Sequence, residues 1–257
     1  MAEPRRGVLV TGAARRVGAA IARGLAEDGW LVALHYNSSA AEAAALAKSL
    51  NRREEVCFPL QADLARRDEV DGLVGRAVEA LARARGKLTC LVNNASPFVF
   101  DSARSLGWGS WDAHIGPGLA APVFLSKYFA ETIAEGEHGL IVNMLDQKIE
   151  GLNPDFLSYS IAKVGLYGAT KMLAMALAPR IRVCGIAPGI MLPGPKQNAA
   201  QFEAAWRRTP LGRNATVEEV VLAVKFLIGA ESATGNIIVL DGGESLTRRG
   251  RDISFET

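Results

Sequence analysis

Cysteine and histidine are scarce in this sequence, which contains three of each among its 257 residues. Each cysteine lies singly in an apolar, strand-like run, and neither residue type shows the paired spacing of a metal site. We therefore expect no metal, and we expect the cysteines to be small core residues of a protein in a reducing compartment, the cytoplasm.

The sequence also lacks a strong charge bias and a long apolar run. Lysine and arginine number 29 against 27 acidic residues, so the net charge of +2 gives no reason to expect nucleic acid or an anionic membrane as a partner. No apolar stretch is long enough to span a bilayer or to form the core of a secretory signal. The length suits one α/β domain, and we expect a single domain over residues 1–257.

What the sequence does contain is a regular alternation of short apolar runs with helical patterns. Seven runs have the length and composition of buried strands: 6–12, 30–36, 55–63, 88–95, 139–145, 181–189 and 236–243. Repeated strand–helix–strand units predict a doubly wound, Rossmann-type α/β domain with a seven-stranded parallel sheet flanked by helices. We expect a dinucleotide-binding part in about residues 1–150 and a catalytic and substrate-binding part in about residues 140–257.

The first predicted strand ends in the sequence VTGAARRVG, where Gly12 and Gly18 flank the turn into a helix. Glycine lets the backbone approach a pyrophosphate closely, and the helix start supplies N–H donors and a favourable dipole. The pattern differs from G-x-G-x-x-G, and taken alone it would equally describe a tight turn.

The end of the second predicted strand indicates which dinucleotide binds. An NAD site usually carries an acid there for the ribose 2′-hydroxyl, but residues 35–39 read HYNSS. We expect Arg16 to lie nearby, and an arginine with hydroxyl groups suits a 2′-phosphate. Alternatively, Arg16 is a solvated residue and the serines cap the next helix. The pattern favours NADPH as the cofactor.

Tyr159 and Lys163 stand four residues apart in the helical pattern of residues 157–178, so they share one face. A lysine beside a tyrosine favours the phenolate, and we therefore expect a lowered Tyr159 pKa and a role in proton donation. Such pairs are common in helices by chance, but this one lies downstream of a nucleotide-binding pattern. The irregular segments 96–110 and 189–206 follow strand ends, and we expect them to be walls of a substrate pocket rather than ordinary surface loops.

Taken in order, these motifs resemble the short-chain dehydrogenase/reductase family over nearly the whole chain. The resemblance rests on TGAARRVG, ADL at Asp63, NNA at 93–95, the Tyr159–Lys163 pair, PG at 188–189 and DGG at 241–243. It implies that Tyr159 protonates the substrate and that Lys163 binds the nicotinamide ribose. It also implies these cofactor-binding residues: Gly12, Arg16, Val17, Gly18, His35, Asn37, Ser38, Ser39, Asp63, Leu64, Asn93, Ala95, Ser96, Tyr159, Lys163, Pro188, Gly189 and Ile190.

Two departures from the general family pattern resemble the pteridine reductases within it. Arg16 replaces the middle glycine of T-G-x-x-x-G-x-G, and Asp146 replaces the catalytic serine thirteen residues before Tyr159. HYNSSAAEA and NNASPF also match this subgroup, in which Ser96 and Phe98 would line the pterin site together with Asp146 and Tyr159. An aromatic ring such as Phe98 can stack on a flat heterocycle. Alternatively, Phe98 packs in the core.

Asp146 has a physical logic of its own. A carboxylate near a phenol can accept its hydrogen bond, and it can bind the amino and ring N–H groups of a 2-aminopteridine more strongly than a serine does. Alternatively, it caps a turn at a strand end. Two mismatches remain: Gly118 stands where the wider family has a relay asparagine, and Ser38 where some pteridine reductases have a basic residue.

The sequence therefore predicts an NADPH-dependent reductase that transfers hydride to a C=N bond of a dihydropteridine or dihydrofolate, with Tyr159, Lys163 and Asp146 as catalytic residues. The first alternative is a short-chain reductase of another carbonyl compound, such as a 3-oxoacyl thioester or a sugar. The second is a non-catalytic NADPH-binding sensor. Apolar helix patterns at 111–134 and 159–178 predict a homo-oligomer, a tetramer by the resemblance.

Overall fold

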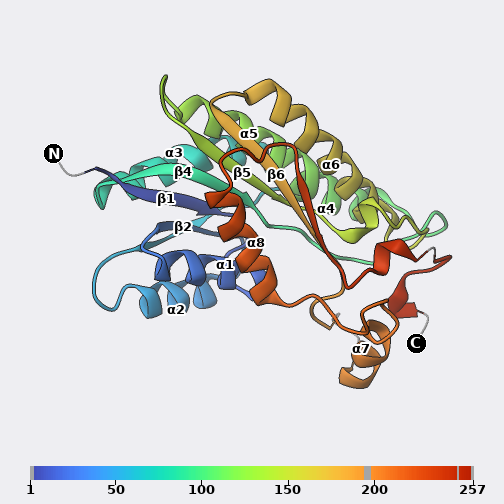
Figure 1. Ribbon diagram of the computed structural model, residues 1–257. Helices are drawn as coiled ribbons and strands as arrows, with labels where there is room; N and C mark the ends of the chain where they lie inside the picture. Colours follow the sequence, from blue (N-terminus) through green and yellow to red (C-terminus); the bar gives the residue numbers. More distant parts are fainter. Residues whose placement is uncertain (1–2, 194–197, 248, 256–257) are drawn as a thin grey trace.

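A parallel sheet forms the centre of the molecule (Figure 1). The computed structural model describes residues 3–193, 198–247 and 249–255, and over these residues the sheet has seven strands in the order β3-β2-β1-β4-β5-β6-β7. The strands are β1 (Arg5–Val10), β2 (Leu31–Tyr36), β3 (Cys57–Gln61), β4 (Gly86–Asn93), β5 (Gly139–Met144), β6 (Ile181–Pro188) and β7 (Ile237–Leu240). This arrangement confirms the predicted doubly wound fold.

Helices cover both faces of the sheet (Figure 1). One face carries α1 and α2 together with α8, and the other carries the helices from α3 to α6. The bounds are α1 (Arg16–Glu27), α2 (Ala40–Leu50), α3 (Arg67–Arg83), α4 (Trp108–Ile115), α5 (Ala121–Thr132), α6 (Leu157–Leu177), α7 (Ala199–Trp206) and α8 (Val217–Gly229). A π-helical turn over Gly116–Ala120 joins α4 to α5.

The apolar runs become strands because both faces of the sheet are covered. All six residues of β5 are buried, and Leu9, Leu91 and Ile141 of neighbouring strands are completely shielded from solvent. Full burial of one such side chain contributes about 1.5–3 kcal/mol. The cysteines lie in this core as predicted: Cys57, Cys90 and Cys184 are buried and unpaired.

The strand order reverses beside β1, and this reversal positions the site. The chain runs outward from β1 through β2 to β3, then returns to place β4 on the other side of β1. The crossover helices after β1 and β4 therefore lie on opposite faces, which opens a crevice at the carboxyl ends of these two strands. Val10 pairs with Val92, and Asn93 pairs with Asn143, so the segments that follow these strands meet at one edge.

Two predicted irregular segments contain more helix than expected. Residues 189–206 include α7, which begins at a capping box between Asn198 and Gln201, and residues 96–110 include the start of α4. Residues 194–197 of the first segment lie outside the described residues. Among the helices that the structure describes, none has the length and apolar character needed to cross a membrane.

Candidate active site

The turn between β1 and α1 is shaped for close approach of the backbone. Gly12 has a left-handed φ of +62°, and a Cβ atom there would lie 3.0 Å from the Cα atom of Ala95. A Cβ on Gly18 would lie 2.2 Å from the carbonyl oxygen of Gly12, which no side chain can accept. Arg16 also has a positive φ, 53°, at the first residue of α1. The turn therefore requires glycine at both predicted positions.

His35 stabilises this turn through hydrogen bonds of its ring nitrogens. The backbone N–H of Gly12 donates to its Nδ1 at 3.0 Å, so Nε2 carries the proton and donates to the carbonyl oxygen of Ala62 at 2.9 Å. Burial lowers the pKa of His35 to about 4, so the ring is neutral. Both ring nitrogens are thus used inside the protein. The side chain shapes the turn, and its contact with a cofactor, which the resemblance implied, stays a prediction.

Of the polar residues predicted to select the dinucleotide, Asn37 and Ser38 follow β2, and Arg16 lies at the start of α1. Arg16, Asn37 and Ser38 are exposed, and the Asn37 side-chain amide donates to the Asp63 carboxylate at 3.4 Å. Ser39 occupies the cap position of α2 but makes no side-chain capping hydrogen bond. The alternative in which this serine caps the helix is therefore wrong. Of the neighbouring predicted residues, Leu64 is buried and Val17 packs against the core.

Asparagines tie the strand ends together on the other side of the turn. Asn93 is buried and donates to Asn143 at 2.8 Å, so its side chain joins β4 to β5. Asn94 donates to the carbonyl oxygen of Thr11 at 2.8 Å, while the backbone N–H groups of Asn94 and Ala95 donate to the Thr11 hydroxyl. We had not singled out Thr11 or Asn94, although both stand inside the quoted TGA and NNA motifs.

The segment after β6 is packed against the end of β7. Gly189 donates its N–H to Leu240 at 2.8 Å, and a Cβ there would lie 2.8 Å from Asp241. Pro188 is buried, whereas Gly189 and Ile190 are partly accessible. This contact explains why the PG and DGG sequences occur together, because the two backbones meet without room for a side chain.

The structure brings the three predicted catalytic residues together. Tyr159 and Lys163 are buried on α6, and the Tyr159 hydroxyl donates to Asp146 Oδ2 at 2.7 Å. Asp146 follows β5, and its Oδ1 accepts the backbone N–H of Lys148 at 2.9 Å. One oxygen thus accepts the hydrogen bond of the phenol and the other caps the turn, while binding of pteridine N–H groups stays a prediction. The Lys163 ammonium donates to the carbonyl oxygen of Met144 at 2.6 Å and lies 5.6 Å from the centre of the Tyr159 ring.

Burial decides how these groups titrate. Burial and the neighbouring Asp146 carboxylate raise the pKa of Tyr159 well above its ordinary value. Burial also raises the pKa of Asp146, although Lys148 opposes the shift, and it lowers the pKa of Lys163 to about 8. The prediction that Lys163 lowers the Tyr159 pKa is therefore wrong. A carboxylate within hydrogen-bond distance and the loss of solvent outweigh the ammonium. Tyr159 is a neutral phenol that holds its proton.

Aromatic rings form a wall beside Tyr159. Phe98 stacks on Phe156 with ring centres 4.2 Å apart, and it meets Tyr159 edge-on at 4.8 Å. Its side chain remains 44% exposed, so the alternative of a core residue is wrong. Ser96 is exposed two residues earlier. A Cβ at Gly118 would lie 4.0 Å from its hydroxyl and 3.5 Å from Ala162, so the replaced relay position faces this same region.

The C-terminal tail extends the aromatic wall, which we had not foreseen. Phe255 stacks on Phe156 at 5.8 Å. Asp252 accepts a hydrogen bond from the buried ammonium of Lys148, and Asp155 accepts from Arg251 and from the backbone of Asp252. These contacts involve single residues distant in sequence, so no periodic pattern in the sequence predicts them.

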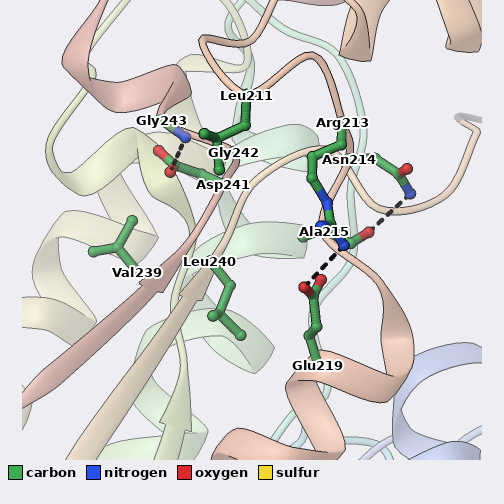
Figure 2. Close-up of a pocket in the computed structure, with 10 residues that line it drawn as sticks. All are labelled: Leu211, Arg213, Asn214, Ala215, Glu219, Val239, Leu240, Asp241, Gly242 and Gly243. Carbon is green, nitrogen blue, oxygen red and sulfur yellow. Dashed lines mark hydrogen bonds and ion pairs between the residues drawn. The ribbon is translucent and has the colours of Figure 1, made fainter.

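Figure 2 shows a pocket of about 230 Å³ elsewhere, between the end of β7 and the start of α8. None of its lining residues belongs to the predicted site. Its polar groups bond to one another: Arg213 contacts Glu219 at 3.4 Å, and Asn214 donates to Ala215 at 2.9 Å (Figure 2). These side chains are therefore engaged with neighbours that also line the pocket.

The sequence of this chain is similar to those of known reductases. A family model described as enoyl-(acyl carrier protein) reductase matches residues 12–245. Pteridine reductase 1 of Leishmania tarentolae is 37% identical, over 93% of this chain and 96% of the relative. A 3-oxoacyl-[acyl-carrier-protein] reductase of Synechocystis sp. is 31% identical, over 91% of this chain and 95% of the relative.

Solved structures give the same picture. FolM alternative dihydrofolate reductase 1 from Brucella canis, complexed with NADP, matches with a TM-score of 0.90 and 40% identity over 98% of both chains. The corresponding protein from Brucella suis, also in complex with NADP, matches with a TM-score of 0.89 and 41% identity, over 95% of this chain and 96% of the other.

Proposed function

The chain belongs to the short-chain dehydrogenase/reductase family of oxidoreductases, and on that premise we propose that it reduces a C=N bond of a dihydropteridine with NADPH. The observation that carries this proposal is the hydrogen bond of 2.7 Å between Tyr159 and Asp146, beside the exposed ring of Phe98. A phenol that holds its proton, a carboxylate and an aromatic face together suit a flat heterocycle with N–H groups.

The residues present fit a dinucleotide. The backbone around Gly12 and Gly18 has no room for side chains, which is the condition for a phosphate to approach the start of α1. This turn would hold the pyrophosphate, Arg16 with Asn37 and Ser38 would hold the 2′-phosphate, and Lys163 would hold the nicotinamide ribose. NADPH supplies the hydride when bound.

The side chains of this protein supply orientation and the proton. Phe98 would hold the pteridine ring flat against the wall, and the Asp146 carboxylate would accept hydrogen bonds from its amino and ring N–H groups. Tyr159 would donate its hydroxyl proton to the ring nitrogen of the C=N bond. Asp146, whose pKa burial raises, would then take up a proton from solvent and pass it to the Tyr159 oxygen, which returns both groups to their starting forms. Lys163 would stabilise the negative charge that develops on Tyr159 meanwhile.

A second candidate is reduction of a simple carbonyl compound, as the name of the Synechocystis relative suggests. Asp146 argues against it, because a carbonyl oxygen only accepts hydrogen bonds and gains nothing from a buried carboxylate. The third candidate, an NADPH-binding sensor without activity, is disfavoured by the intact contact between Tyr159 and Asp146.

The test is NADPH consumption on a panel of 7,8-dihydrobiopterin, dihydrofolate and a 3-oxoacyl thioester. We expect turnover of the pteridines, and we expect Tyr159→Phe to lower kcat by about 10²–10⁴ because only the proton donor is removed. The Kd for NADPH should stay unchanged in that variant. Near-parental kcat in Tyr159→Phe would refute the mechanism, and turnover of the thioester alone would refute the substrate.

A further inference from the structure

Three buried polar side chains meet at the start of α6, outside the groups used so far. Asp101, His114 and Ser158 are 1%, 1% and 0% exposed, respectively. They come from three elements: the segment after β4, the helix α4 and the first turn of α6. Burying such groups is costly unless each is hydrogen-bonded, so their contacts reveal what the cluster does.

The helix α6 begins without a local cap. Phe156 occupies the cap position in a left-handed conformation with φ of 55°, and its side chain has no acceptor for the free N–H groups of the first turn. Asp101 supplies the acceptor from elsewhere in the chain. Its Oδ1 accepts the N–H of Ser158 at 3.0 Å, and its backbone oxygen accepts the N–H of Leu157 at 3.3 Å. A distant carboxylate therefore caps the helix that carries Tyr159 and Lys163.

The direction of the other hydrogen bonds follows from one backbone donor. The N–H of Val99 donates to His114 Nε2 at 3.1 Å, so this nitrogen is an acceptor and Nδ1 carries the proton. Nδ1 therefore donates to the Ser158 hydroxyl at 2.7 Å, and that hydroxyl donates to the Asp101 carboxylate. Every donor in the chain from Val99 to Asp101 has an acceptor.

The charges of the two titratable groups agree with this arrangement. Burial lowers the pKa of His114, although the Asp101 charge opposes the shift, so the neutral ring with one acceptor nitrogen is favoured. Burial alone would raise the pKa of Asp101, but the hydrogen bonds from Ser158 outweigh it and the pKa is lowered. The contacts therefore require a charged Asp101 carboxylate and a neutral His114 ring.

We infer that Asp101, acting through Ser158 and His114, is a positioning residue that locks the Phe98 wall to the first turn of α6. The network adjoins two site residues, because Val99 follows Phe98 and Ser158 precedes Tyr159. The His114 ring also meets the Tyr159 ring edge-on at 5.9 Å. The inference rests on the proposed role of Tyr159 as proton donor. A loosened network would let the hydroxyl and the stacked substrate drift apart, and small displacements are costly in rate.

The kinetic experiment compares four variants with one control. Asp101→Ala removes the cap, Ser158→Ala removes only the bridging hydroxyl, and His114→Phe keeps a ring beside Tyr159 but removes both hydrogen bonds. Asp101→Asn keeps an acceptor for the Ser158 N–H and should restore part of the rate. The control is Asp112→Ala, because this carboxylate is exposed on the same helix as His114.

We expect Asp101→Ala and His114→Phe to lower kcat by about 10- to 100-fold. The KM for the substrate should change less than kcat. The Kd for NADPH should stay within about twofold of the parent, because the hydrogen bonds of the network do not involve the turn between β1 and α1. If Asp101→Ala does not fold, Ser158→Ala decides the question, since it leaves the backbone cap in place. An unchanged kcat in folded Ser158→Ala and His114→Phe would overturn the inference.

A second measurement on the parent protein alone does not depend on turnover. Nitrogen-15 NMR of the His114 side chain should show a neutral ring protonated at Nδ1, and hydrogen exchange should show a protected Ser158 amide. A ring protonated at Nε2 would overturn the network whatever the substrate is. If the pteridines are not reduced, the proposed function fails separately, and the same variants are then compared on any carbonyl compound that the enzyme does reduce.

Discussion

At the scale of single residues, the candidate site depends on a carboxylate that serves two neighbours. One oxygen of Asp146 holds the turn after β5 through the N–H of Lys148, and the other accepts the hydroxyl of Tyr159. The first contact fixes the direction of the second. A serine at this position has a single, uncharged oxygen, so it could not give each partner an acceptor atom of its own.

Glu244 gives a prediction about pH at this scale. This buried carboxyl accepts a hydrogen bond from Gln147 at 3.1 Å, and burial with the nearby Asp252 and Asp146 raises its pKa to about 7 from an ordinary 4.5. Because the folded state binds the proton more tightly, the stabilisation is fully present below pH 4.5 and is lost as the pH rises through about 7. The loss amounts to at most about 3 kcal/mol.

The variant Glu244→Gln should remove this dependence, because an amide keeps the acceptor oxygen and does not titrate. Between pH 5 and pH 8, we expect the free energy of unfolding of the variant to rise relative to that of the parent, by up to about 3 kcal/mol. Urea unfolding at several pH values measures it. The exposed Glu218→Gln on α8 is the control. Parallel pH profiles for parent and Glu244→Gln would contradict the assignment.

Arg16 gives a prediction about the choice of cofactor. Its exposed guanidinium lies at the start of α1, where the wider family has glycine. We expect Arg16→Ala to raise the KM for NADPH by about 10- to 100-fold, because one or two charge-assisted hydrogen bonds to the 2′-phosphate are lost. The KM for NADH should change little. Arg15→Ala is the control, since Arg15 is equally exposed but pairs with Glu42 at 3.5 Å. Equal effects on the two cofactors would rule out contact with the 2′-phosphate.

The residue scale also shows where sequence reasoning succeeds and fails. The spacing of four between Tyr159 and Lys163 survives folding, because a helix fixes which side chains share a face. The pKa of Tyr159 could not be predicted from that spacing. That pKa depends on burial and on Asp146, which lies at the end of another strand. The hydrogen bonds of the His35 ring to Gly12 and Ala62 could not be predicted either, because they also join distant segments.

At the scale of elements, the ends of helices and of the chain hold the substrate side together. The helix α6 takes its cap from Asp101, and the tail after β7 returns to the turn that follows β5. Lys148 in that turn is buried, as is Asp252 in the tail. A buried ion pair is strongly destabilising when only one partner is removed, because the other charge is left in the protein interior.

We therefore expect Lys148→Met and Asp252→Asn each to lower the free energy of unfolding by about 3–5 kcal/mol. The double variant should lose less free energy of unfolding than the two single variants lose together, since it leaves no unpaired charge. Denaturant unfolding measures all three. Lys127→Met is the control: it breaks an exposed pair with Glu131 on α5 and should cost less than about 1 kcal/mol. Additive losses would show that the two residues are not coupled.

Element prediction from the sequence was good where periodicity carries the signal. Each of the seven apolar runs overlaps a strand, because a sheet covered on both faces needs continuous apolar sequence. The helix α7 was missed because its eight residues lie in a segment that reads as a loop after Gly189. The docking of the C-terminal tail was missed because it depends on two ion pairs, made by Arg251 and Asp252, and on the ring of Phe255, without a repeating pattern.

At the scale of the whole molecule, the helices α5 and α6 leave apolar side chains uncovered. Phe124 on α5 is half exposed, and on α6 Met172 and Met175 are 67% and 75% exposed. Exposed apolar side chains gathered on neighbouring helices often mark an interface, and the sequence predicted an oligomer from the same helices. This state remains a prediction.

We expect a homotetramer by light scattering at micromolar concentration. The double variant Met172→Glu/Met175→Glu should give a smaller species, because two charges would be buried without partners at the interface. Arg53→Glu is the control, since it adds an acid at an exposed position in the turn after α2. A monomeric parent protein would contradict the prediction.

We propose that Asp146 makes this reductase specific for a heterocycle with N–H groups, and the decisive measurement is kcat/KM in the parent and in Asp146→Ser. We expect the variant to lose activity on 7,8-dihydrobiopterin by about 10- to 100-fold, because a buried N–H edge loses its charged partner. Its activity on a simple ketone should be unchanged or higher, since a serine hydroxyl can donate to the ketone oxygen. An equal loss on both substrates would contradict the claim, as would a parent protein that does not reduce the pteridine.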